Sequence, residues 1–131
     1  MQDRREYFIL KNEIIYLGDE IKVGDDFFES QSKTISGRYK LEKINLNDID
    51  VVKKGIADRS YFYWEDGKNL DIIKENFYKT PPVILEYLNG SYYSVDGHHR
   101  ITVAKELGLT NILAFVIKVD KLTHNRDGFR F

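Results

Sequence analysis

The feature that most constrains this fold is a pair of β-rich runs joined by Asn89-Gly90. Val83 to Leu88 and Ser91 to Val95 are both rich in β-branched and aromatic residues. An Asn-Gly pair between two such runs is a strong signal for a β-hairpin, because both residues tolerate positive φ. The sequence therefore predicts an antiparallel hairpin that turns at Asn89-Gly90.

The residues after this hairpin predict a helix and then a strand. Ile101, Ala104 and Leu107 recur at helical spacing, and Gly108 follows where a left-handed helix cap is expected. The next run, Ile112 to Val119, is apolar. The order of hairpin, helix and strand predicts an α+β fold.

Earlier in the chain the sequence predicts short strands and turns. Tyr7 to Leu10 and Glu13 to Leu17 are expected to pair across Lys11-Asn12, and Ser30 to Gly37 is expected to be a loop. Tyr39 to Ile44 alternates as a strand does. We therefore expect a β-rich extension over residues 1–38 of the same domain, a main domain over residues 39–120 and a polar tail over residues 121–131.

Two helices are expected between these strands. One begins at Asn47-Asp48 and ends at Gly55. The other runs from Leu70 to Tyr78, with Asn69 as its cap and Pro81-Pro82 as its end.

Composition excludes several classes of function. The 131 residues include no cysteine, so disulfides, thiolate metal sites and cysteine nucleophiles are excluded. No apolar run approaches about 20 residues, and the N-terminus carries no signal-peptide pattern, so we expect a cytoplasmic protein without a membrane partner. The net charge of -1 does not favour DNA as a partner, because DNA binders neutralise phosphates with basic residues.

The turn between the hairpin and its helix carries the candidate functional residues, Asp96, Gly97, His98, His99 and Arg100. A helix N-terminus exposes backbone N–H groups without intrahelical partners and suits an anion. Gly97 lets the anion approach the backbone, Arg100 adds a planar donor fork for phosphate, and the histidines add ring N–H donors. Asp96 would hold a Mg²⁺ that bridges to phosphate, or accept from a ribose hydroxyl.

A structural explanation of the same residues stays open. Asp-Gly before a helix is a common turn, in which Asp96 would cap the helix and Arg100 would lie on the surface. A metal site made by His98 and His99 is disfavoured, because adjacent helical residues point about 100° apart. The chain also lacks the G-x-S-x-G element of serine hydrolases.

From Pro81 to Lys118 the sequence, PPVILEYLNGSYYSVDGHHRITVAKELGLTNILAFVIK, resembles the ParB N-terminal/sulfiredoxin superfamily. The shared pattern is a proline-led strand, a strand that ends in Gly-x-x-Arg, a helix with small residues and an apolar strand. Tyr39 to Ile49 and Leu70 to Lys79 are similar to the family's opening strand with its first helix and to its next helix. The resemblance implies a mixed sheet with packed helices over residues 39–118. The Asp-Gly-His-His-Arg motif is closest to kinase-like and uncharacterised members.

In that superfamily the Gly-x-x-Arg turn binds nucleotide phosphates: CTP in partition proteins, ATP in sulfiredoxins, and ATP or ADP in free serine kinases. Gly97 and Arg100 match the glycine and arginine of the motif, and His99 matches the sulfiredoxin histidine. His98 stands where sulfiredoxin has its catalytic cysteine, so sulfiredoxin chemistry is excluded. The two histidines replace the Glu-Arg of partition proteins and no helix-turn-helix domain follows residue 118, so a complete CTP-dependent partition protein is not expected.

The resemblance implies a nucleotide-binding domain that uses ATP or another nucleotide, with Mg²⁺. As a phosphotransferase or NTPase acting on a small-molecule acceptor, it would hold the metal through Asp96. Its base would come from an acidic cluster, Asp58, Glu65 and Asp66, for which an exposed charged loop is the alternative explanation. Two other functions stay open: a non-catalytic DNA-associated regulator or ParB-like nuclease module of phage or mobile-element origin, and a fold kept for protein contacts.

Overall fold

The computed structural model describes residues 1–29, 33–50 and 64–123, with side chains from residue 69 onward in the last range. Within these ranges no helix is both long and apolar enough to cross a membrane.

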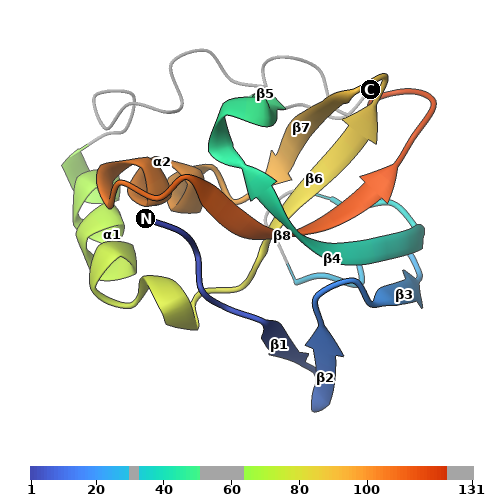
Figure 1. Ribbon diagram of the computed structural model, residues 1–131, viewed down its shortest axis with the longest axis horizontal. Helices are drawn as coiled ribbons and strands as arrows, with labels where there is room; N and C mark the ends of the chain where they lie inside the picture. The colour runs from blue at the N-terminus through green and yellow to red at the C-terminus, as the bar shows by residue number, and fades with distance from the viewer. Residues whose placement is uncertain (30–32, 51–63, 124–131) are drawn as a thin grey trace.

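A six-stranded mixed sheet forms the centre of the fold (Figure 1). Its strands are β3 (Glu20–Val23), β4 (Gly37–Asn45), β5 (Ile49–Asp50), β6 (Val83–Leu88), β7 (Ser91–Asp96) and β8 (Asn111–Lys118). Their spatial order is β3-β4-β8-β6-β7-β5. β8 runs parallel to β6 and β5 runs parallel to β7, whereas the other pairs are antiparallel. The expected α+β fold with a mixed sheet is confirmed.

The predicted hairpin of β6 and β7 is confirmed. Leu88 pairs with Ser91 across a two-residue turn, in which Asn89 has a φ of 49° and Gly90 a φ of 88°. Positive φ at both central positions is the turn geometry that matches the twist of the flanking strands.

A second hairpin, predicted at the N-terminus, is also present. β1 (Tyr7–Leu10) pairs with β2 (Glu13–Tyr16), and this two-stranded sheet packs on the main body below β4 in Figure 1. The chain then enters β3, a strand that the sequence analysis did not predict, which pairs with β4 as an edge strand. The extension thus contributes one strand to the main sheet.

Two helices lie side by side at one end of the sheet (Figure 1). They are α1 (Trp64–Glu75) and α2 (His98–Glu106), and a 3-10 turn, η3 (Phe77–Lys79), follows α1. The prediction for α2 is confirmed. The predicted start of α1 is wrong, because the helix begins at Trp64 and Asn69 lies inside it. The hydrophilic sequence WEDGKN has no apolar repeat that would reveal this first turn.

The helix expected at Asn47-Asp48 is replaced by a 3-10 turn, η1 (Leu46–Asp48), and the short strand β5. The side chain of Asn45 accepts a hydrogen bond from the Asn47 amide at 2.9 Å and caps this turn. Ile49 then pairs with Tyr92 of β7 and is buried, so the ladder with β7 takes the place of a helix. The rest of the expected helix, to Gly55, lies outside the described residues.

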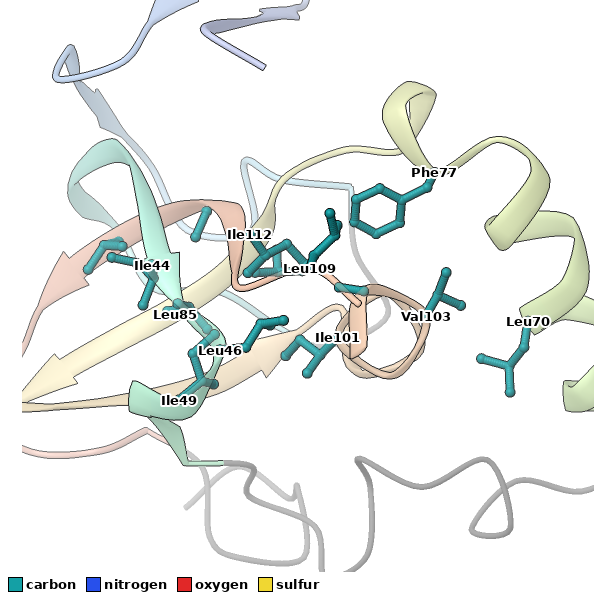
Figure 2. Close-up of a cluster of buried hydrophobic side chains, with 14 residues drawn as sticks. Ile44, Leu46, Ile49, Leu70, Phe77, Leu85, Ile101, Val103, Leu109 and Ile112 are labelled. Carbon is teal, nitrogen blue, oxygen red and sulfur yellow. The ribbon is translucent and has the colours of Figure 1, made fainter. Parts of the chain in front are cut away.

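Each face of the sheet carries its own hydrophobic core. Figure 2 shows the first core, where Leu70 of α1 and Ile101 and Val103 of α2 pack with Leu85 of β6. The second core is built around Tyr39 and other residues on the opposite face and is covered by the N-terminal extension. β8 supplies alternate residues to both cores and is buried on both faces, as a central strand should be.

Candidate functional site

The candidate site begins where β7 ends and α2 starts. Asp96 is the last residue of β7, and Gly97 is the N-cap of α2 with a φ of 103° and a ψ of 25°. The first intrahelical bond runs from the Ile101 amide to the Gly97 carbonyl at 2.9 Å. The cap residue is a glycine without a side chain, so an anion could approach the N-terminus of α2, where the helix dipole places partial positive charge.

An irregular register in the hairpin precedes this turn. Leu85 pairs with Ser94 but Ile84 pairs with Asp96, so β7 has one more residue than β6 at this point. Such bulges bend a strand and redirect its side chains, often beside functional sites. The bulge therefore sets the direction from which Asp96 enters the turn.

Gly97 is required at its position by close contact as well as by its backbone angles. A Cβ built on this residue would lie 2.5 Å from Cγ1 of Val83 and 3.0 Å from Nη2 of Arg100. No other residue type fits there without moving β6 or α2, so the glycine of the motif has a packing role that its sequence pattern did not reveal.

Arg100 is turned inward in this structure. Its Nη2 donates to Oδ2 of Asp96 at 2.9 Å, and its Nη1 donates to the carbonyls of Pro81 at 2.8 Å and Pro82 at 3.4 Å. The side chain is 13% exposed, so an ordinary surface role is excluded. Burial lowers the pKa of Arg100, the charge and hydrogen bond of Asp96 oppose this, and the nearby charge of Arg5 adds to it. The guanidinium remains charged, as arginine does in proteins.

This burial corrects one expectation from the sequence. If Arg100 lay on the surface, its replacement would hardly affect folding. That prediction does not fit a side chain that donates hydrogen bonds to three acceptors. Substitution of Arg100 is therefore expected to lower the stability of the fold as well as to weaken ligand binding.

Asp96 is the one carboxylate of the turn, and its Oδ2 is held by Arg100. Among the described residues no group of three histidine, aspartate or glutamate side chains could hold a metal. Mg²⁺ on Asp96 would therefore take its remaining ligands from phosphate and water, which is a usual arrangement for this ion.

The two histidines occupy the first turn of α2 and are both half-buried. Nε2 of His98 lies 2.9 Å from Oγ of the buried Ser94 on β7, so this ring is anchored at one nitrogen. Nε2 of His99 is buried. The two rings thus lie in different surroundings, as neighbours about 100° apart on a helix should.

The acidic candidates away from the turn are only partly placed. Glu65 and Asp66 fall in the first turn of α1, the helix that packs against α2, and their side chains lie outside the described residues. Asp58 lies outside the described residues altogether. Their roles remain predictions.

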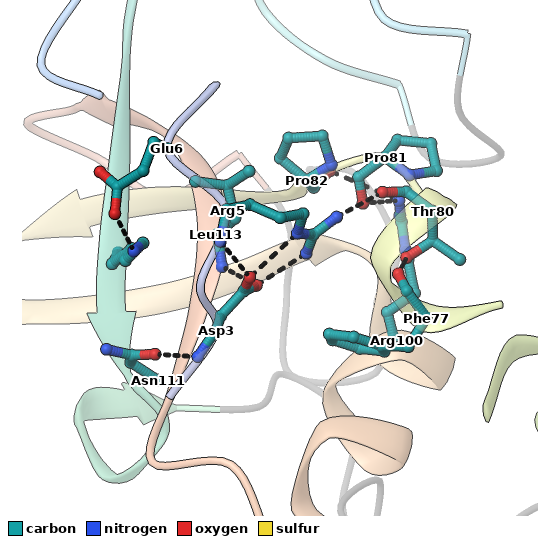
Figure 3. A network of polar contacts seen from close by, with 11 residues as sticks. Asp3, Arg5, Glu6, Phe77, Thr80, Pro81, Pro82, Arg100, Asn111 and Leu113 are labelled. Carbon is teal, nitrogen blue, oxygen red and sulfur yellow. Dashed lines mark hydrogen bonds and ion pairs between the residues drawn. The ribbon is translucent and has the colours of Figure 1, made fainter. Parts of the chain in front are cut away.

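Sequence reasoning missed two residues beside the site, Asp3 and Arg5 (Figure 3). Arg5 donates to the Thr80 carbonyl, immediately before the two prolines whose carbonyls accept from Arg100. Asp3 is fully buried and pairs with Arg5 at 2.7 Å. A buried acid two residues from an arginine leaves no signature in the polar N-terminal sequence, so only the structure reveals this network.

A cavity of 1250 Å³ lies at the opposite end of β6 and β7. Tyr87, Tyr92 and Val116 form part of its wall, together with acidic and basic residues of β4 and of the chain after β8. None of the five turn residues lines it, so this cavity is distinct from the turn.

Fold and turn together define an α+β domain with a glycine-initiated helix N-terminus as its candidate binding site. No protein-family model matches the sequence, and no curated protein matches it. Solved structures do resemble it. Sulfiredoxin from Arabidopsis thaliana has a TM-score of 0.47 and 25% identity, over 61% of this chain and 86% of that chain.

Two further solved structures are similar in fold. ParB from Caulobacter crescentus, complexed with CTP-gamma-S, has a TM-score of 0.45 and 21% identity, over 62% of this chain and 46% of that chain. A free serine kinase in complex with AMP has a TM-score of 0.43 and 20% identity, over 70% of this chain and 34% of that chain. This chain thus spans less than half of either protein.

Proposed function

We propose that this chain binds a nucleotide through its phosphates at the turn from Asp96 to Arg100. The observation that carries the proposal is the left-handed Gly97 at the start of α2, which lets an anion approach the helix N-terminus beside the Arg100 guanidinium. An anion of phosphate size would gain from the helix dipole there.

Each neighbouring side chain has a role in this proposal. Arg100 supplies positive charge from behind the turn, and its N–H groups outside the bonds to Asp96 and the proline carbonyls are the donors for phosphate. His98 is the histidine that contacts the ligand, and His99 steadies the turn. Asp96 accepts from a ribose hydroxyl or joins a Mg²⁺ that the nucleotide brings.

The finer proposal is phosphoryl transfer to a small-molecule hydroxyl, or nucleotide hydrolysis. Such reactions depend on positioning and charge neutralisation, with a carboxylate near the attacking oxygen. Asp96 is the candidate carboxylate inside the turn, and Glu65 and Asp66 at the start of α1 are the candidates outside it. Mg²⁺, when bound with the nucleotide, would neutralise charge on the phosphates.

A thermal-shift screen of nucleoside di- and triphosphates, with and without Mg²⁺, tests the binding proposal. A ligand at a hundredfold excess over its Kd stabilises the folded chain by about 2.7 kcal/mol, so even weak binding is measurable. Stabilisation by nucleotides but not by the free nucleosides is expected. If no nucleotide raised the melting temperature above that of the ligand-free chain, the proposal would be refuted. Retention on DNA that weakens steeply with salt would favour the DNA-associated alternative instead.

A further inference from the structure

The turn that precedes β6, Thr80-Pro81-Pro82, has an unusual hydrogen-bonding constraint. Proline has no backbone N–H, so Pro81 and Pro82 cannot donate to any neighbour. The two prolines can therefore hydrogen-bond only through their carbonyl oxygens, whereas Thr80 also donates its amide and its hydroxyl to the Phe77 carbonyl. Three consecutive carbonyls, those of Thr80, Pro81 and Pro82, accept from arginine side chains in the structure (Figure 3).

Two different arginines share these carbonyls. Nη1 of Arg5 donates to the Thr80 carbonyl at 2.6 Å, whereas Nη1 of Arg100 donates to the next two. Arg5 comes from the N-terminal segment, and Arg100 from the first turn of α2. Both guanidinium groups thus fix one short turn, and a shift of the turn would move the acceptors of Arg100.

Arg5 is itself held rigidly. Its Nε and Nη2 donate to the two oxygens of Asp3 at 3.0 and 2.7 Å, and its guanidinium lies 5.3 Å from the centre of the Phe77 ring. Oδ2 of Asp3 also accepts from the Leu113 amide at 3.0 Å, which ties the pair to β8. The guanidinium group of Arg5 is therefore oriented, through Asp3, by the central strand β8.

From this chain of contacts we propose that Arg5, oriented by Asp3, is a positioning residue for the anion site and acts through the Thr80–Pro82 turn on Arg100. The effect on ligand binding rests on the proposed function, whereas the effect of Arg5 on the position of Arg100 does not. Arg5 does not itself touch the anion; it fixes the carbonyls that determine where the guanidinium of Arg100 lies. This arrangement resembles the outer contacts that orient ligands in other binding sites.

Three variants separate this role from general stability. Arg5→Ala removes the fork and the charge, whereas Arg5→Lys keeps the charge but cannot reach Asp3 and the Thr80 carbonyl with one planar group. Arg4→Ala is the matched control, because it removes an exposed charge one residue away in the same segment. Melting temperatures would confirm that each variant is folded before affinity is compared.

Affinity for ATP is the first measurement. We expect both Arg5 variants to raise the Kd about tenfold, as loss of an orienting contact does at other sites, and Arg4→Ala to leave the Kd unchanged. If only Arg5→Ala weakened binding, the effect would be one of charge and the positioning role would be refuted.

The guanidinium signals of Arg100 in ¹⁵N NMR spectra are the second measurement, assigned by their loss in Arg100→Lys. They should report restricted rotation in the unmodified chain and freer rotation in both Arg5 variants. Folded Arg5 variants with unchanged Arg100 signals would overturn the inference. If the unmodified chain bound ATP and the Arg5 variants bound it no more weakly, the positioning role would fail; if the unmodified chain bound none of the nucleoside di- and triphosphates, the proposed function would fail, and the NMR comparison alone would decide whether Arg5 positions Arg100.

Discussion

Replacement of Gly97 by alanine gives the sharpest test of how the turn is built. Two costs add at this position. A non-glycine residue in a left-handed conformation costs about 1–2 kcal/mol, and Gly97 has a φ of 103°. The added Cβ would lie 2.5 Å from Cγ1 and 2.8 Å from Cβ of Val83, and overpacking of this kind costs about 1–3 kcal/mol. The expected loss is therefore about 2–5 kcal/mol.

Gly108→Ala is the matched control for this substitution. Gly108 also has a positive φ, 76°, at the other end of the same helix, but a Cβ there would meet nothing within 4 Å. Its replacement should cost only the conformational part, about 1–2 kcal/mol. The difference between the two variants isolates the close contacts of the added Cβ with Val83 and Arg100.

Urea unfolding measures both losses. With an m-value of about 2 kcal/mol/M, Gly97→Ala should lower the midpoint by about 1–2.5 M and Gly108→Ala by about 0.5–1 M. In a Val83→Ala background, where Cγ1 is absent but Cβ remains 2.8 Å away, the cost of Gly97→Ala should fall but stay above the Gly108→Ala value. Equal midpoints for the two single variants would show that close packing on β6 plays no part, and would refute the reasoning.

Three further predictions concern the polar groups. Arg100→Ala should destabilise the fold by about 1.5–3 kcal/mol, because Asp96 and two carbonyls lose a charged donor; a loss below about 0.5 kcal/mol in urea would contradict this. Burial raises the pKa of Asp3, but Arg5 and the Leu113 amide outweigh it and hold the pKa below its usual value. Asp3 therefore stabilises the fold above about pH 4, and this stability is lost as pH falls through the lowered pKa. In Asp3→Asn, the free energy of unfolding should fall less steeply with decreasing pH below about pH 4. An unchanged slope would exclude this stabilising role of Asp3. His98→Ala should weaken nucleotide binding, measured as Kd, because a ring N–H donor is lost from the site, and an unchanged Kd would remove His98 from the site.

Local patterns predicted the parts of the fold that depend on near neighbours. Asn89-Gly90 predicted its hairpin because both φ angles are set by those two residues, and the spacing of Ile101 and Ala104 predicted α2 because one face of a helix must be apolar. The start of α1 escaped prediction because its first residues are polar. The short strand after Asn47 was not predicted because β5 forms only by pairing with β7. Its residue Ile49 pairs with Tyr92, which lies 43 residues later in the chain.

The candidate site was predictable in composition but not in orientation. The sequence brought Asp96 to Arg100 together because they are consecutive. It could not show that Arg100 turns towards carbonyls 18 and 19 residues earlier, nor that Arg5 reaches Thr80 across 75 residues. Those contacts depend on how the sheet brings distant segments together, and no local pattern records them.

The bond between Asp3 and the Leu113 amide has a consequence for how the chain is made. The two residues are 110 positions apart, so during synthesis Asp3 leaves the ribosome long before its partner exists. At about 5–20 residues per second, the N-terminal segment waits about 5–20 s for β8 to follow. Until then Asp3 has only Arg5 beside it, and the anchorage of both to β8 must form late. A nascent chain arrested before β8 should therefore leave this segment open to proteases, although the β1–β2 hairpin beyond it can already form from local contacts.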